Sequence, residues 1–183
     1  LGLTAGNALE VRESVEVLAG GGPDDVVELT LALAREMLAG AGRDDVDPAD
    51  ALADGRAMDV WRRMIAAQGG DPDAPLPTAR ESEQVLAPAD GVLVGLDALA
   101  VGVAAWRLGA GRARKEDPVQ AGAGIELHAK PGALVRAGEP LMTLHTDTPE
   151  RFARALAALE GAVTIAPEGS RPPERPLVID RVA

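Results

Sequence analysis

A glycine-rich turn followed by three cations runs from Leu108 to Asp117. Gly109 and Gly111 stand before Arg112, and the other two cations follow within three residues. Glycine lets backbone N–H groups approach an anion closely, and a guanidinium adds paired donors, so these residues predict an anion-binding loop. A loop that only joins a helix to a strand, with its charges in solvent, is the alternative interpretation.

Other groups able to do chemistry are few. The sequence has no cysteine, which excludes disulfides, thiolate metal sites and cysteine nucleophiles. His128 and His145 are the only histidines, and they lie on predicted strands about one hairpin apart. They either share a ligand site across that hairpin or are ordinary half-buried histidines. Lys115 and Lys130 are the only lysines.

Composition excludes several classes of function. The 183 residues are 46% hydrophobic and 26% charged, which suits one or two globular domains. A net charge of −11 with only three aromatic residues argues against nucleic acid as a partner, because it repels a polyanion and offers no stacking platform. No apolar run reaches the roughly 20 residues that cross a bilayer, so a cytoplasmic protein is expected. The chain starts at Leu1 rather than Met, so we expect a fragment.

The first part of the chain has a helical pattern. Apolar residues recur every three or four positions over 6–20, 24–38 and 55–68, and 48–52 resembles a short turn in a loop. The second helix is apolar over so much of its surface that it is predicted to be buried. Prolines after residue 71 indicate a linker. We therefore expect domains at 1–72 and 84–183, joined by a linker at 73–83.

The second part combines strands and helices. Asp97 is the expected N-cap of one helix over 97–107, and Thr148 that of another over 149–160, with Pro149 at its first position. Short runs bounded by glycine and proline predict strands at 84–86, 91–96, 124–129, 140–145, 162–166 and 176–182. This domain is therefore expected to be α+β, with a strongly twisted sheet.

The hairpin over residues 129–144 resembles half of the hammerhead of biotinyl and lipoyl carrier domains. Its Pro-Gly turn, its Ala-Gly turn and the apolar strand that follows carry the resemblance. Carrier chemistry needs a lysine displayed on a tight turn, and neither Lys115 nor Lys130 has that setting. The fold element is therefore expected without the modification.

Six spaced motifs carry a resemblance that covers nearly the whole chain. They are Leu1–Glu13, Asp24–Leu38, Ala66–Asp71, Ala87–Gly91, Gly109–Arg112 and Gly138–Leu141. In this order they resemble segments of the thymidine and pyrimidine-nucleoside phosphorylases. The resemblance implies an α/β region followed by an α+β region: the last helices of the large α/β phosphorylase domain, then a C-terminal domain with a hammerhead-like, barrel-sandwich sheet and two helices.

The resemblance also implies an activity. The family transfers a pentosyl group from thymidine to phosphate, giving thymine and 2-deoxyribose 1-phosphate, in pyrimidine nucleoside salvage and without a redox cofactor. The implied partners are a pyrimidine deoxynucleoside and phosphate, and the complete enzyme is a homodimer through helices near its N-terminus. In the family, the groups that bind phosphate and base lie upstream of this segment, so no catalytic residue is expected here. The chain alone is predicted to be inactive; a non-catalytic hammerhead-type binding or scaffolding module is the alternative.

One family site maps onto residues that are present. The resemblance implies a potassium ion held by the carbonyl oxygens of Leu1 and Thr4 and by the carboxylate of Glu13. A hard cation of low charge suits such an oxygen set. Glu13 as a simple surface residue on an amphipathic helix is the alternative interpretation.

Overall fold

The computed structural model describes residues 2–173 and 176–182, which form two compact units. The helical unit contains residue 2, residues 12–75 and residues 176–182. The α+β unit contains residues 3–11 and 76–173. The main division of the chain thus falls between Pro75 and Leu76, although a short N-terminal segment groups with the second unit. The assignment of residues 1–72 to a large α/β domain stays a prediction.

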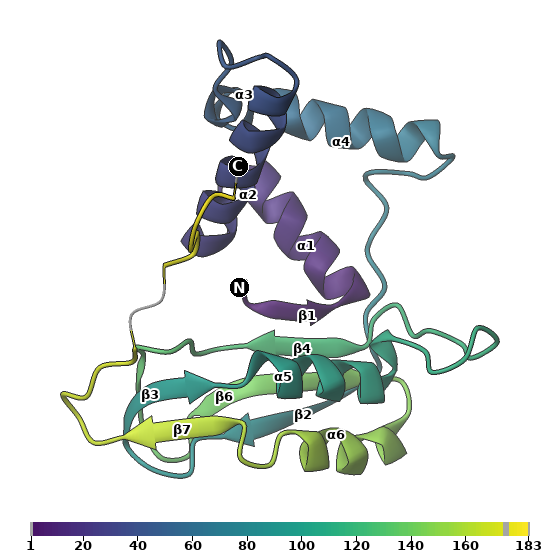
Figure 1. Ribbon diagram of the computed structural model, residues 1–183. Helices are drawn as coiled ribbons and strands as arrows, with labels where there is room; N and C mark the ends of the chain where they lie inside the picture. The colour runs from purple at the N-terminus through teal and green to yellow at the C-terminus, as the bar shows by residue number, and fades with distance from the viewer. Residues whose placement is uncertain (1, 174–175, 183) are drawn as a thin grey trace. The chain divides into compact units, whose positions relative to one another are not determined.

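Helices make up the regular structure of the helical unit within the described residues. They are most of α1 (Asn7–Leu18), then α2 (Asp24–Gly40), α3 (Pro48–Ala53) and α4 (Arg56–Ala67) (Figure 1). Asp47 caps α3 by accepting from the Ala49 N–H at 3.1 Å, and its carboxylate lies 3.0 Å from Nη2 of Arg35 on α2. The backbone hydrogen bond, assisted by Arg35, holds the pKa of Asp47 below its usual value. This carboxylate therefore ties α3 to α2.

The prediction that α2 is buried was wrong. No residue of α2 is buried in the described structure, and the side chains of Leu33 and Met37 are 53% and 70% exposed. Periodicity shows that a surface is apolar but does not show which polypeptide covers it. Within the described residues, the rest of the chain covers this helix only in part, because Val26, Val27 and Leu29 are half-buried.

The strand predicted at 176–182 was also wrong, because these residues form no strand. Ile179 and Val182 are 89% and 95% exposed, and Arg181 forms an exposed ion pair with Glu36 at 2.9 Å. A β-prone run becomes a strand only where another strand offers its backbone groups. Here the run meets helix α2 instead.

Two antiparallel sheets form the α+β unit, confirming the expected class. One sheet has the order β1-β4-β6-β2, from Thr4–Gly6, Gly124–Leu127, Pro140–Thr146 and Glu81–Leu86. The other has the order β5-β3-β7, from Leu134–Val135, Gly91–Leu96 and Val163–Ala166. The sequence pattern missed β1, because its three residues stand directly before a helix. The hammerhead-like geometry stays a prediction.

Helices cover one face of the four-stranded sheet. They are α5 (Ala98–Ala105), its π-helical continuation η1 (Trp106–Ala110), the 3-10 turn η2 (Pro149–Arg151) and α6 (Phe152–Ala158) (Figure 1). Ile125 on β4 pairs with Leu144 on β6, and both are fully buried against these helices with Leu108. This core fixes where α5 and α6 end, and those ends carry the candidate site.

The two histidines do not form a shared site. The His128 N–H donates to the Leu141 carbonyl, which places it four residues from His145 along β6, about 13 Å at the usual strand rise. Nε2 of His128 lies 2.7 Å from the Thr143 hydroxyl, and Nε2 of His145 lies 3.5 Å from the Glu126 carboxylate. The two histidines are therefore separate. His145 is half-buried, as the second interpretation has it, whereas His128 is exposed.

Candidate anion-binding pocket

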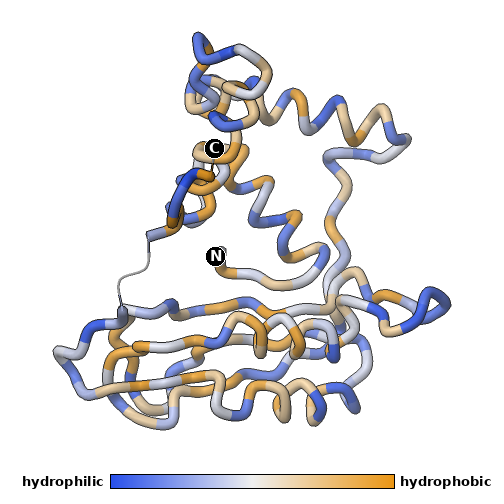
Figure 2. The backbone as a smooth tube through the Cα atoms, in the orientation of Figure 1, coloured by the Kyte–Doolittle hydropathy of each residue, from blue (hydrophilic) through white to orange (hydrophobic). Residues whose placement is uncertain are grey.

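Gly109 ends the helix that begins at α5. Its φ of 118° lies outside the range that other residues adopt, so it breaks the helical backbone inside η1. The Gln120 N–H then donates to the Gly109 carbonyl at 2.9 Å, which closes the intervening loop at its base. Figure 2 shows the tip of this loop in blue, the colour of hydrophilic residues, because the tip carries the charged residues. The first and last residues of the loop therefore lie next to each other, at Gly109 and Gln120.

A buried hydroxyl fixes this base to β6. Thr146, the last residue of β6, is 0% exposed and its hydroxyl lies 2.7 Å from the Leu108 carbonyl and 3.0 Å from Oε1 of Gln120. The Thr148 N–H donates to the Thr146 hydroxyl at 3.2 Å, and Nε2 of Gln120 donates to the Thr148 hydroxyl at 2.8 Å. One network therefore joins the end of η1, the loop and the start of η2.

Thr146→Val is expected to lower the free energy of unfolding of the α+β unit by about 1–3 kcal/mol, because it leaves buried polar partners without a hydrogen bond while keeping the side-chain shape. Chemical denaturation followed by circular dichroism measures the change. Thr164→Val, on an exposed position of β7, is the matched control and should stay within about 0.5 kcal/mol of the parent. Equal effects of the two substitutions would show that the network does not contribute.

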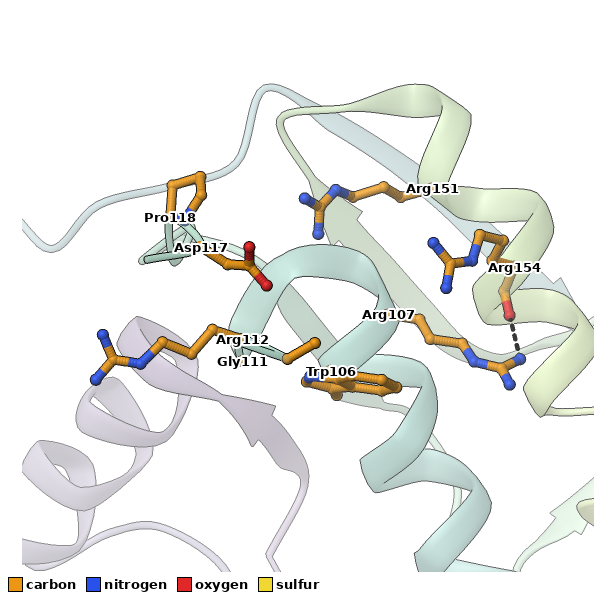
Figure 3. Close-up of a pocket in the computed structure, with 9 residues that line it drawn as sticks. Trp106, Arg107, Gly111, Arg112, Asp117, Pro118, Arg151 and Arg154 are labelled. Carbon is orange, nitrogen blue, oxygen red and sulfur yellow. Dashed lines mark hydrogen bonds between the residues drawn. The ribbon is translucent and has the colours of Figure 1, made fainter. Parts of the chain in front are cut away.

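A cavity of about 310 Å³ lies between the loop and the η2–α6 segment. Its polar lining is mostly cationic (Figure 3). We call it the arginine pocket and define it by Trp106, Arg107, Arg112, Asp117, Arg151 and Arg154. Four arginines and one aspartate line it, so the lining residues carry an excess of three positive charges in a chain whose net charge is −11. Figure 3 shows the guanidinium groups of Arg151 and Arg154 directed into the space, whereas that of Arg112 extends away from them.

The wall that comes from η1 is held by short contacts. Nη1 of Arg107 donates to the Arg154 carbonyl at 2.8 Å, whereas its Nε is buried with no hydrogen-bond partner in the described structure. A Cβ added at Gly111 would lie 2.6 Å from Cδ1 of Trp106, so glycine is needed for the backbone to pass the indole. The Arg114 N–H donates to the Asp117 carboxylate at 2.8 Å, which sets the turn of the loop. These contacts orient the wall without neutralising its arginines.

The structure brings together part of the predicted loop site. Gly111 and Arg112 line the arginine pocket, and Nη1 of Arg112 also donates to the Lys115 carbonyl at 3.2 Å. Gly109 lies beside the pocket, because a Cβ there would be 3.1 Å from Nη1 of Arg151. The anion-binding role of these three residues stays a prediction.

Sequence reasoning missed the opposite wall. Arg151 is the last residue of η2 and Arg154 lies in the first turn of α6, one helical turn further and more than thirty residues after the loop. Their spacing indicates that they share a helix face, but nothing in it points to the loop. Only the packing of α5 against α6 in the core brings them to the same cavity.

The residues of the predicted potassium site are described only in part. Leu1 lies outside the described residues. Thr4 belongs to β1, where it pairs with Glu126, and Glu13 lies on α1. The half-buried Glu13 carboxylate packs directly on the backbone of Gly2, where any side chain would overlap it. Within the described residues there is no group of three acidic, histidine or cysteine side chains placed to hold a metal ion.

Among the described residues, no helix combines the length and the apolar character needed to cross a bilayer.

Comparison with known proteins gives a consistent match. Residues 92–166 match the family described as the pyrimidine nucleoside phosphorylase C-terminal domain, and this range contains every residue of the arginine pocket. The chain is 58% identical over 182 residues to a thymidine phosphorylase of Mycobacterium tuberculosis, covering 100% of this chain and 42% of that protein. It is 39% identical over 183 residues to the pyrimidine-nucleoside phosphorylase of Bacillus subtilis, covering 94% and 42%.

Human thymidine phosphorylase is a more distant relative, 35% identical over 185 residues that cover 90% of this chain and 38% of the human protein. The chain thus spans about two fifths of the length of the curated relatives it matches. The match lies wholly within the α+β unit and includes strands from both of its antiparallel sheets. The chain therefore belongs to the thymidine and pyrimidine-nucleoside phosphorylase family and contains its C-terminal domain.

Proposed function

We propose that this chain is part of a thymidine phosphorylase, which transfers the 2-deoxyribosyl group of thymidine from thymine to phosphate. The observation that carries the proposal is the 58% identity to the Mycobacterium tuberculosis enzyme over the full length of this chain. The products would be thymine and 2-deoxyribose 1-phosphate, in pyrimidine nucleoside salvage. The complete enzyme is then expected to be a cytoplasmic homodimer.

We further propose that these 183 residues alone do not catalyse phosphorolysis. Such a reaction needs a held phosphate and donors that stabilise the departing base in a transition state resembling an oxocarbenium ion. The chain has only two lysines, Lys115 on the exposed loop and Lys130 after β4. Neither is proposed to bind the reacting phosphate or the base. The role proposed for the α+β unit is to support the catalytic half and to present the loop with Gly109, Gly111 and Arg112 to its cleft.

Thymidine phosphorolysis by the purified chain tests this proposal. With phosphate in excess, the expected result is no thymine above the buffer blank, measured by chromatography. The Mycobacterium tuberculosis enzyme, assayed in the same buffer, is the positive control. Turnover by the chain at an ordinary enzymatic rate, on the order of 1–1,000 per second, would contradict the proposed division of labour.

A monovalent cation is a further part of the proposed function. Potassium would be held by carbonyl oxygens of Leu1 and Thr4 and by the carboxylate of Glu13, where it would neutralise the carboxylate and fix the start of α1. The packing of Glu13 on the Gly2 backbone supports this, because it sets the carboxylate beside main-chain groups. No other cofactor is proposed.

A second candidate function is a non-catalytic binding or scaffolding module of the hammerhead type. One observation favours it: the α+β unit has its own buried core and its own cavity, so it can hold a ligand without further residues. Turnover separates the two candidates only when the chain is combined with a catalytic half, because both predict an inactive chain. Binding to the arginine pocket is tested separately below.

A further inference from the structure

We propose that the arginine pocket binds a phosphate monoester, at a site formed by residues of the α+β unit alone. This inference goes beyond the proposed function, because it assigns a ligand of its own to the α+β unit, and it depends mainly on Arg151 and Arg154 rather than on the loop proposed to face the cleft. It rests on the charge of the pocket, on the unused donors that line it, and on its size and mixed lining.

The charge of the pocket is opposite to that of the chain. Its local excess of three positive charges stands against a net charge of −11 for the whole protein. Like charges gathered in one concavity repel one another, and low-dielectric walls focus their field into it. An anion that enters the pocket therefore relieves this repulsion, although the protein as a whole repels it.

Several donors of the pocket are not used by the fold. Among the described residues, the guanidinium groups of Arg151 and Arg154 have no ion pair and no hydrogen bond. Figure 3 shows Arg151 and Arg154 extending from their helix toward the space that Asp117 borders on the other side. These donors are available to an oxyanion.

The number of donors favours phosphate over a carboxylate. A guanidinium binds two oxygens side by side, and a phosphate monoester offers three terminal oxygens with a charge of about −1.5 to −2 at neutral pH. Two guanidinium groups can therefore be satisfied by one phosphate. A carboxylate has two oxygens and a single charge, so it would leave part of the excess uncompensated.

The size and lining of the pocket favour an ester over the free ion. A volume of about 310 Å³ lies at the lower end of the usual range for organic ligands, roughly 300–1,000 Å³. The indole of Trp106 is 40% exposed and offers an apolar surface, while Asp117 can accept from a hydroxyl group. The phosphate would contact Arg151 and Arg154, and the organic part would contact Trp106 and Asp117.

Fluorescence of Trp106 tests the proposal directly. In a Trp61→Phe background Trp106 is the only tryptophan, so its emission reports on the pocket. The chain is titrated with ribose 5-phosphate, with inorganic phosphate and with ribose. We expect a saturable change with ribose 5-phosphate, at a dissociation constant on the order of 0.1–1 mM, about tenfold weaker binding of inorganic phosphate, and no change with ribose.

Two variants each remove one arginine charge, one inside the arginine pocket and one outside it. Arg154→Ala should weaken binding of ribose 5-phosphate about tenfold, the effect of losing one charge-assisted hydrogen bond. Arg63→Ala, on an exposed position of α4, should leave the dissociation constant within about twofold. Both side chains are exposed, so circular dichroism should show the parent fold for each.

Acidity gives an independent readout. The second pKa of a phosphate monoester is about 6, so lowering the pH from about 7.5 to 5 converts the dianion to a monoanion and should weaken binding several-fold. If the dissociation constant of ribose 5-phosphate stayed the same at both pH values, the assignment of the ligand as a phosphate would be wrong. If ribose 5-phosphate and inorganic phosphate bound with equal affinity, the preference for an ester would be wrong. The absence of a saturable response to either compound up to about 10 mM, or equal losses in the two arginine variants, would overturn the site itself.

Discussion

Leu144→Ala should lower the free energy of unfolding of the α+β unit by about 2–5 kcal/mol. Leu144 lies in the middle of β6, is 0% exposed, and pairs with Ile125 on β4. Its side chain fills the layer between the four-stranded sheet and helix α5, in one cluster with Leu108 and Ala104. Alanine loses the transfer free energy of three carbon atoms and leaves a cavity that rigid neighbours on several elements cannot close.

The loss should be visible in the unfolding transition of this unit alone. Urea denaturation monitored by Trp106 fluorescence, again in the Trp61→Phe background, separates it from the helical unit, which then contains no tryptophan. Leu134→Ala is the matched control: Leu134 is 59% exposed on β5, so its replacement should change stability by no more than about 0.5 kcal/mol. A loss below about 1 kcal/mol for Leu144→Ala would mean that the sheet and helix layer is not the main core.

Local patterns in the sequence were enough to predict much of the α+β unit. Asp97 was expected to cap a helix, and its carboxylate does accept from the N–H groups of Leu99 and Ala100 at 2.8 and 3.2 Å. The strand predicted at 91–96 has those bounds in the structure. The Asp97 cap is made by neighbouring residues, so no distant partner had to be known. The strand pairs with the distant β5 and β7, but its own apolar run and flanking turns mark its ends.

The predictions failed where a distant segment decides the outcome. Thr148 was expected to cap a helix over 149–160, but it makes no capping hydrogen bond, and the segment is a 3-10 turn followed by the shorter α6. Its hydroxyl instead accepts from Gln120, 28 residues earlier. The same limit applies to the candidate site: Arg112 was found from its glycine-rich context, whereas Arg151 and Arg154 become pocket residues only through tertiary packing.

The candidate site depends on the fold in a way that can be measured, because one glycine links the core to the pocket. Gly109 is buried, and its φ of 118° is a conformation that costs other residues about 1–3 kcal/mol. A Cβ there would lie 2.9 Å from Cδ of Gln120 and 3.1 Å from Nη1 of Arg151. The first contact belongs to the buried network at the base of the loop, and the second to the wall of the arginine pocket.

Gly109→Ala is therefore expected to destabilise the α+β unit by more than the backbone strain alone, and to weaken binding of ribose 5-phosphate in the same sample by displacing Arg151. Denaturation and the Trp106 titration measure the two effects. Gly102→Ala is the matched control within the same helical segment, since Gly102 lies in α5 with open space around it and alanine there should stabilise by about 0.5–1 kcal/mol. The two substitutions add the same methyl group, so opposite signs would assign the difference to the backbone and contacts of Gly109. If Gly109→Ala instead left stability and binding unchanged, the end of η1 would not position the pocket.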